Sequence, residues 1–131
     1  MKKLLLILLL IPNLVMAENV MYCQDELATG IVKENGVWIT NNFNLERYTI
    51  KFNDDYTKLE GLAFPYKCSQ IFGASNDQAR LISCRSIVGT SDTFIFNKLS
   101  KRYQYYSMSP FSFVENGPDT SNFSAGTCEA F

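Results

Sequence analysis

The four cysteines are the strongest constraint on how this chain folds. They lie at positions 23, 68, 84 and 128, and four cysteines allow three pairings. Turn-forming residues lie midway between Cys68 and Cys84, and folding this stretch as a hairpin about Asn76 brings the two cysteines opposite each other. The remaining disulfide, Cys23 to Cys128, would join the first strand to the last. The spacing therefore favours the disulfides Cys68–Cys84 and Cys23–Cys128.

Residues 1–17 have the three-part pattern of a secretory signal peptide. Lys2 and Lys3 precede a short apolar stretch, and small residues lead to a cleavage site after Ala17. The apolar stretch is shorter than the roughly 20 residues that a membrane-spanning helix needs. No second such stretch follows, so we expect no transmembrane segment in the mature chain, residues 18–131. We expect that chain to be periplasmic or secreted, where disulfides form.

The mature chain is long enough for one domain with its own core. Loss of the two signal lysines lowers the basic residues from 12 to 10, against 13 acidic residues. Such a weakly acidic balance gives no electrostatic footprint for nucleic acid or for an anionic membrane surface. We therefore expect no nucleic-acid partner.

Hydrophobic residues alternate with a period of two, which is typical of strands rather than helices. Tyr48, Ile50 and Phe52 fall on one face of an expected strand over residues 47–53. Asn35-Gly36 separates two further apolar runs, and this dipeptide accepts the positive φ angles of a tight hairpin turn. The other expected strands cover residues 56–62, 66–72, 80–86, 93–96, 103–106 and 126–131.

Turn signals recur about every ten residues, the rhythm of an all-β sandwich or barrel. In an antiparallel meander the first and last strands become neighbours only when the sheet closes on itself. The expected Cys23–Cys128 disulfide therefore favours a closed or partly closed barrel of about eight strands. A β-sandwich is the alternative.

Aromatic residues are abundant, with 18 in the chain. A hairpin with its turn over residues 97–102 pairs Phe94 with Tyr105 and Phe96 with Tyr103, and places all four on one face. Trp38 follows the Asn35-Gly36 turn, opposite a lysine, and could be partly exposed near a barrel rim. These rings are candidates for binding a small hydrophobic or amphipathic ligand inside a barrel. A packed core and an outer patch for a protein partner are the alternatives. The candidate ligand-binding residues are Trp38, Phe94, Phe96, Tyr103 and Tyr105.

Three short motifs carry a resemblance to known proteins: ATGIVKENGVW near the start, DTFIFNKLSKRYQYY in the middle and GTCEAF at the end. The chain resembles a set of small exported bacterial proteins of unknown function. Those proteins also have an early cysteine, a tryptophan after a tight turn and a terminal Gly-Thr-Cys. The resemblance implies a bacterial envelope setting and brings no known activity.

The residues give little support for catalysis or for a metal site. The chain has no histidine, the commonest general base, and no Cys-x-x-Cys spacing for zinc. Four cysteines in disulfides leave no thiol nucleophile. Asp54 and Asp55 are expected in a turn, because acidic side chains cap turns by local hydrogen bonds. We therefore expect no catalytic residue, no cofactor and no metal.

Two functional hypotheses follow from these features. The first is a non-catalytic binding module that holds a small ligand in an aromatic-lined barrel. The second is an interaction or inhibitor protein that acts on another envelope protein. An enzyme is the third class, disfavoured because no pair of nucleophile and base can be named.

Overall fold

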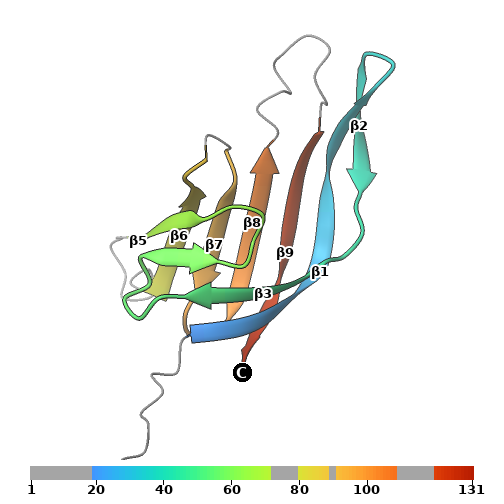
Figure 1. Cartoon of the computed structure of the whole chain (residues 1–131). Coiled ribbons are helices and arrows are strands. Elements are labelled where there is room, and N and C mark those ends of the chain that lie inside the picture. Colours follow the sequence, from blue (N-terminus) through green and yellow to red (C-terminus); the bar gives the residue numbers. More distant parts are fainter. Residues whose placement is uncertain (1–18, 72–79, 89–90, 109–119) are drawn as a thin grey trace, which may run out of the picture.

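Nine antiparallel strands make up the part of the chain that the computed structural model describes, residues 19–71, 80–88, 91–108 and 120–131 (Figure 1). The predicted signal peptide and the predicted hairpin centre at Asn76 lie outside these described residues. The strands are β1 (Asn19–Glu34), β2 (Val37–Asn42), β3 (Arg47–Phe52), β4 (Lys58–Glu60), β5 (Tyr66–Gln70), β6 (Leu81–Ser86), β7 (Thr93–Asn97), β8 (Arg102–Met108) and β9 (Thr120–Ala130).

Eight of the strands form a closed antiparallel barrel. Each of β3 to β8 pairs with the next strand in the chain, and β1 pairs with both β3 and β9 to complete the ring. The prediction of an all-β barrel of about eight strands is therefore confirmed. The ninth strand, β2, pairs with the far half of β1 and lies outside the ring.

Strand β1 is long because it belongs to both the barrel and a projecting hairpin. Its first residues pair with β3 and its last residues pair with β2, in one unbroken register. Strands β2 and β3 are thus two halves of one bent strand, interrupted over residues 43–46. Two backbone hydrogen bonds bridge the interruption, from the Asp25 amide to Glu46 and from the Phe43 amide to Ala28, each 3.0 Å long. We call residues 29–42, the hairpin in which the end of β1 pairs with β2, the arm.

The tip of the arm is the predicted tight turn. Asn35 and Gly36 both have positive φ angles, 50° and 80°, as a type I′ turn requires. Lys33 pairs with Trp38 across the hairpin, and the lysine ammonium lies 5.7 Å from the centre of the indole ring. The predicted register of this hairpin is confirmed.

Both predicted disulfides are present. Cys68 and Cys84 are direct partners on β5 and β6, and Cys23 and Cys128 are direct partners on β1 and β9. All four side chains are buried. The Cys23–Cys128 disulfide therefore fastens β1 to β9, the two strands whose pairing closes the barrel.

Inward-facing residues fill the barrel at the end away from the arm. Phe52, Phe94 and Phe96 have no exposed surface. The Phe52 and Phe96 rings lie 5.2 Å apart, and Phe94 stacks on Tyr103 at 5.1 Å. Aliphatic side chains complete this packed floor, namely Ile50, Leu59 and Ile82.

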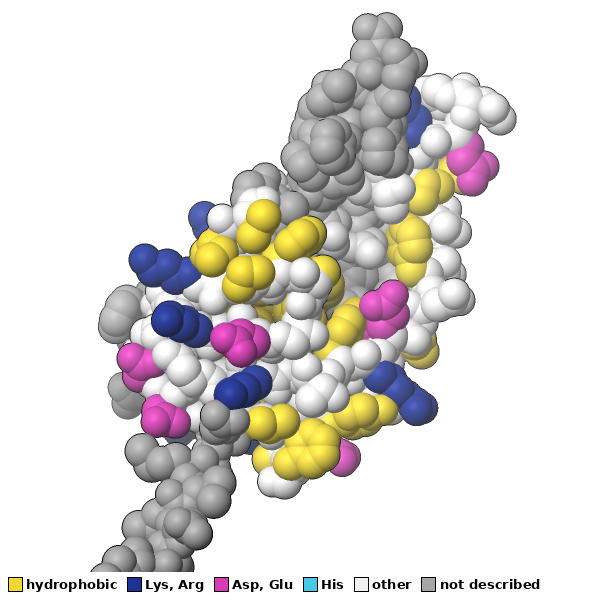
Figure 2. Space-filling model, viewed as in Figure 1, with side chains coloured by type: hydrophobic (Ala, Val, Ile, Leu, Met, Phe, Trp, Pro, Cys, Tyr) yellow, Lys and Arg dark blue, Asp and Glu magenta, His cyan; other side chains and the backbone are white. Residues whose placement is uncertain are grey.

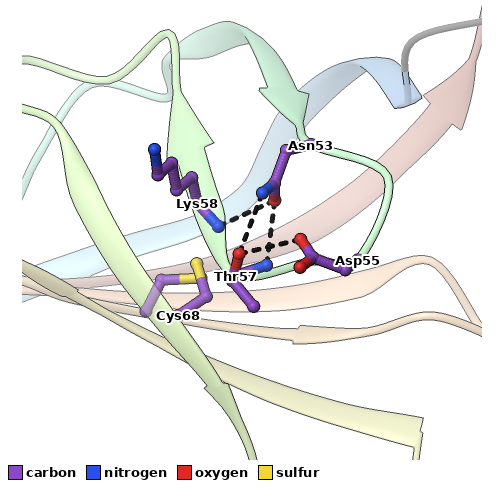
Figure 3. Close-up of a disulfide and its surroundings, with 6 residues drawn as sticks. Asn53, Asp55, Thr57, Lys58 and Cys68 are labelled. Carbon is purple, nitrogen blue, oxygen red and sulfur yellow. Dashed lines mark hydrogen bonds between the residues drawn. A yellow bond between two sulfur atoms is a disulfide. The ribbon is translucent and has the colours of Figure 1, made fainter.

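The predicted turn after β3 forms beside the Cys68–Cys84 disulfide (Figure 3). The Asn53 side chain accepts hydrogen bonds from the amides of Thr57 and Lys58, 2.9 and 2.8 Å long. The Thr57 hydroxyl donates to Asp55 at 2.8 Å, and this hydrogen bond lowers the pKa of the Asp55 carboxyl. The Cys68 amide donates to the Thr57 carbonyl at 2.8 Å. Asp55 therefore serves to build this turn, as expected from sequence.

Two strands show the largest differences in length from their predicted ranges. The strand expected over residues 56–62 is only Lys58–Glu60, because Tyr56 and Gly61 have positive φ angles that interrupt extended backbone. The last strand begins at Thr120 rather than near residue 126, because it follows β1 along most of its length. Turn residues at both ends shorten β4, and pairing with the long β1 extends β9.

Removing the Cys23–Cys128 disulfide by double alanine substitution should lower the free energy of unfolding by about 4–5 kcal/mol. This bridge closes a loop with a sequence separation of 105, and longer loops constrain the unfolded chain more. The matched Cys68→Ala/Cys84→Ala variant opens a separation of only 16 and should cost about 3 kcal/mol. Denaturant unfolding of both variants measures the difference. An equal or larger cost for the Cys68→Ala/Cys84→Ala variant would contradict the role of the Cys23–Cys128 disulfide in closure.

Candidate functional site

The barrel interior changes from apolar to polar toward the arm. Above the phenylalanine floor lie four tyrosines, and two of them, Tyr66 and Tyr105, place their hydroxyls 3.3 Å apart. Tyr48 meets both Tyr103 and Tyr105 edge to face, with ring centres 6.3 and 6.1 Å apart. The rings hold one another in place while their hydroxyls face a shared polar region.

A buried acid, Asp25, lies at the centre of this polar region. It is only 2% exposed, because it follows Met21 and Cys23 on the inward face of β1. Its carboxyl oxygens accept hydrogen bonds from the Tyr103 hydroxyl at 2.5 Å, the Glu46 amide at 3.0 Å and the Tyr48 hydroxyl at 3.4 Å. All three contacts are donated to the carboxyl group, which suits an ionised carboxylate.

The neighbouring tyrosines are held in their protonated form. Burial, followed by the hydrogen bond to Asp25, raises the pKa of Tyr103 far above its usual range. Burial and the negative charges of Asp25 and Glu46 raise the pKa of Tyr48 in the same way. Both hydroxyls therefore keep the proton that each donates to Asp25.

A glycine on β9 makes room for the Asp25–Tyr103 contact. A Cβ atom on Gly126 would lie 2.8 Å from the Tyr103 hydroxyl and would also collide with the backbone of Gln24. Gly126 pairs with Asp25 just before a β-bulge, where Glu26 has no partner on β9. The bulge changes which side chains face inward, so that Ala28 and its partner Ser124 are both buried.

A cavity of about 310 Å³ opens at the arm end of the barrel. We call it the mouth cavity. Its lining residues include two acids, four aromatic residues and several small polar residues. The lining residues are Asp25, Ala28, Phe43, Asn44, Glu46, Tyr48, Tyr105, Ser107, Asn122, Phe123 and Ser124.

Ser124 brings a buried hydroxyl to the wall of the mouth cavity. The residue is 7% exposed, and its hydroxyl makes no direct hydrogen bond to a described residue, although it lies near enough to the Tyr48 hydroxyl to counter part of the rise in that group's pKa. Buried polar groups nearly always have partners, so this hydroxyl is open to a hydrogen bond with solvent or with a ligand.

A second cavity, of about 560 Å³, lies on the outer face of β6 to β9. Its aliphatic wall includes Leu81 and Ile95, which alternate with the buried residues of the same strands. Glu26 and Arg102, both exposed, lie among its lining residues. This outer groove mixes apolar and polar residues, and none of its described lining residues has a buried polar side-chain atom without a partner.

No group of three or more acidic, histidine or cysteine side chains in the described ranges could hold a metal ion. The Ser124 hydroxyl is not hydrogen-bonded to a base among the described residues, as an activated serine nucleophile would be. The wall of the mouth cavity offers a bound molecule hydrogen bonds, charge and ring contacts.

The structure separates the five predicted ligand-binding residues. Phe94 and Phe96 belong to the packed floor and line neither cavity. Tyr103 is buried against Asp25 and lines the outer groove, whereas Tyr105 lines the mouth cavity. Their cross-strand pairing is confirmed, since Phe94 faces Tyr105 and Phe96 faces Tyr103. Their role in ligand binding stays a prediction.

Trp38, the fifth candidate, lies on β2 in the arm. It is 43% exposed, so the expectation of a partly exposed ring is confirmed. The ring lies on the projecting hairpin rather than on the barrel itself, because the Asn35-Gly36 turn is beyond the point where β1 leaves the ring of strands.

Sequence reasoning missed the polar residues of the mouth cavity. Asp25 could have been found, because it shares the parity of Cys23, whose disulfide already requires an inward side chain. Ser124 could not, because counting by twos from Cys128 places it inside but gives no reason to expect an open cavity next to it. Glu46 was missed for a different reason, namely that its segment interrupts a strand.

Comparison with known proteins adds no relative to this description. No protein-family model, curated protein or solved structure matches the chain. The function must therefore be argued from the site itself.

Ser124→Ala should leave the free energy of unfolding unchanged or raise it by up to about 1 kcal/mol, because it removes a buried hydroxyl that lacks a protein partner. Thermal or denaturant unfolding in the absence of ligand measures the change. Ser83→Ala on β6 is the matched control for replacing a strand serine. A loss above about 2 kcal/mol for Ser124→Ala would show that the hydroxyl has a strong partner after all.

Phe96→Ala should lower the free energy of unfolding by about 3–5 kcal/mol, because it leaves a void in the packed floor. Trp38→Ala, at an exposed position, should cost below about 1 kcal/mol. Comparing the two variants distinguishes an aromatic residue that stabilises the barrel from one that does not. A small cost for Phe96→Ala would indicate that the floor is loosely packed and open to a ligand.

Proposed function

We propose that the protein is an exported, non-catalytic binding module that holds a small ligand in the mouth cavity. One observation carries the proposal: a cavity of about 310 Å³ whose wall includes a buried hydroxyl without a partner. Ligand pockets have volumes of about 300–1,000 Å³ and a few well-placed polar groups among apolar ones. The mouth cavity meets both conditions at the small end of the range.

The proposal moves the ligand from the barrel interior to its end. The phenylalanine floor leaves no part of Phe52, Phe94 or Phe96 exposed, whereas the mouth cavity combines rings with hydroxyl, amide and carboxyl groups. A ligand there would be amphipathic, with an apolar part against Phe43 and Tyr105. This keeps the predicted ligand class and changes the residues that contact it.

Export is supported by the disulfides and by the sequence motifs. Two disulfides fit an oxidising, extracellular environment. The described residues include no helix that is long and apolar enough to cross a membrane. The predicted signal peptide and the resemblance to small exported bacterial proteins agree with a periplasmic setting.

Native mass spectrometry of the full chain, expressed with its own leader and purified from a bacterial periplasm, tests this function. We expect a co-purifying small molecule. Asn122→Phe should displace it, because Asn122 lines the mouth cavity and a phenylalanine ring would fill the space.

Ser121→Phe is the matched control, since the preceding residue on β9 points to the opposite face. Retention of the molecule by Asn122→Phe would place the ligand elsewhere. A folded protein that carries no ligand, and whose mouth-cavity amide resonances do not respond to a periplasmic small-molecule extract, would rule out the proposal.

An interaction or inhibitor protein is the second candidate, favoured by the edge of β2. This strand pairs only with β1 among the described strands, and all six of its residues are exposed and uncharged. Figure 2 shows apolar side chains along the β1 and β2 hairpin. An exposed strand edge can accept a strand from a partner. A blue shift of Trp38 fluorescence on adding a purified envelope protein, absent from a Thr40→Pro variant, would favour this function.

A further inference from the structure

We infer that the ligand of the mouth cavity is a small organic cation, an amine joined to an apolar body. The inference rests on the proposed function and narrows it to one chemical class. It follows from the charge of the cavity wall, from the free acceptor at Ser124 and from the rings beside them.

The charge of the wall favours a cation. Asp25 and Glu46 are its two acidic residues, and no basic residue is among its described lining residues. Asp25 is almost fully buried, so solvent screens its charge weakly. A third acid, Asp92, is 5% exposed and lies close enough to Tyr66 and Tyr105 to affect both hydroxyls. An anionic ligand would meet repulsion at this end of the barrel.

Hydrogen-bond capacity points the same way. Tyr103 and Tyr48 already donate to Asp25, so those two hydroxyls are used as donors within the protein. The Ser124 hydroxyl, which makes no direct hydrogen bond to a described residue, can accept a hydrogen bond from a ligand as well as donate one, and the carboxyl group of Glu46 can accept further hydrogen bonds. An ammonium group carries up to three donors and no acceptor, which suits a wall with acceptors to spare.

Aromatic rings supply the remaining contacts. Phe43, Tyr48 and Tyr105 line the cavity, whereas the ring of Phe123, a fourth lining residue, packs against Tyr106 on the other face of β9. The faces of such rings attract cations, and the attraction strengthens where water is excluded. The same rings provide an apolar surface for the rest of the ligand. Acidic groups beside several rings are the chemistry that recognises amines rather than neutral alcohols or acids.

The size of the cavity favours an organic molecule over a bare metal ion. A volume of about 310 Å³ is about ten times the share of one water molecule in the liquid. The described residues also offer no cluster of three metal-ligating side chains. A compact amine with one ring or a short alkyl chain fits this volume.

Three probes of nearly equal size test the inference: 2-phenylethylamine, 2-phenylethanol and phenylacetate. They carry a positive charge, no charge and a negative charge at neutral pH. Titrations of the full exported chain, followed by the amide resonances of Tyr105, Asn122 and Ser124, measure their affinities. We expect saturable binding of the amine at least about tenfold tighter than that of the alcohol, and weaker binding still of the acid.

Two substitutions then identify the groups responsible. Glu46→Gln should weaken binding of the amine about threefold to tenfold and leave the affinity for the alcohol unchanged, because only the charge of the side chain is removed. Glu46 is exposed, so this change leaves the packing intact. Glu60→Gln, an exposed acid on β4 outside the cavity wall, is the control for overall charge. Ser124→Ala should weaken binding of the amine without lowering the melting temperature of the protein.

The outcomes separate this inference from the proposed function. If the alcohol or the acid binds as tightly as the amine and shifts the same amide resonances, the inference of a cationic ligand is wrong, but the proposed binding function is retained. Equal effects of Glu46→Gln and Glu60→Gln would show that charge at the cavity wall is not what the amine senses, and would also overturn it. No response to any probe would count against both. Saturable Ca²⁺ binding at these amides, with none by the amine, would replace the organic cation by a metal ion.

Discussion

The pairing of β1 with β9 is the contact on which the rest of the structure depends. It closes the ring of eight strands, and the Cys23–Cys128 disulfide fastens it within the register. Closure removes the free edges that an open sheet would expose. It also requires β1 to curve along one end of the barrel and then to rise beside β9, as Figure 1 shows. The bulge at Glu26 lies within this pairing, and bulges bend strands in this way.

The interior that results is divided between stability and binding. At one end, phenylalanine rings pack without exposed surface, and such packing contributes most of the favourable free energy of folding. At the other end, the barrel buries Asp25, which is costly unless the acid is fully hydrogen-bonded. Tyr103, Tyr48 and the Glu46 amide provide those hydrogen bonds. A well-packed apolar residue would avoid this cost, so stability alone does not explain the acid, and its position agrees with the binding role proposed for the mouth cavity.

Much of the fold could be predicted because its rules are local. Alternation identified the inward face of β3, Asn35-Gly36 identified the hairpin tip, and hairpin symmetry identified both disulfides. The mouth cavity could not be predicted because it depends on departures from those rules. A bulge shifts the parity of β1 after Asp25, and no residue type announces it. The aromatic residues were recognised as inward-facing, but alternation cannot distinguish a packed floor from the lining of a cavity. That distinction depends on how neighbouring strands approach one another.

Two irregularities occur at the same level of β1, on its two opposite edges. On one edge, the bulge at Glu26 turns Ala28 inward, opposite Ser124. On the other edge, residues 43–46 interrupt the strand and bring the Phe43 ring over Gly30, where a Cβ atom would touch it. The same interruption places the Glu46 amide on Asp25. A regular strand pairing on either edge would leave fewer polar groups converging at this level. Irregular pairing costs stability, and its coincidence with a buried acid and an unpartnered hydroxyl indicates that the mouth cavity, rather than the aromatic floor, is the part of the barrel shaped for function.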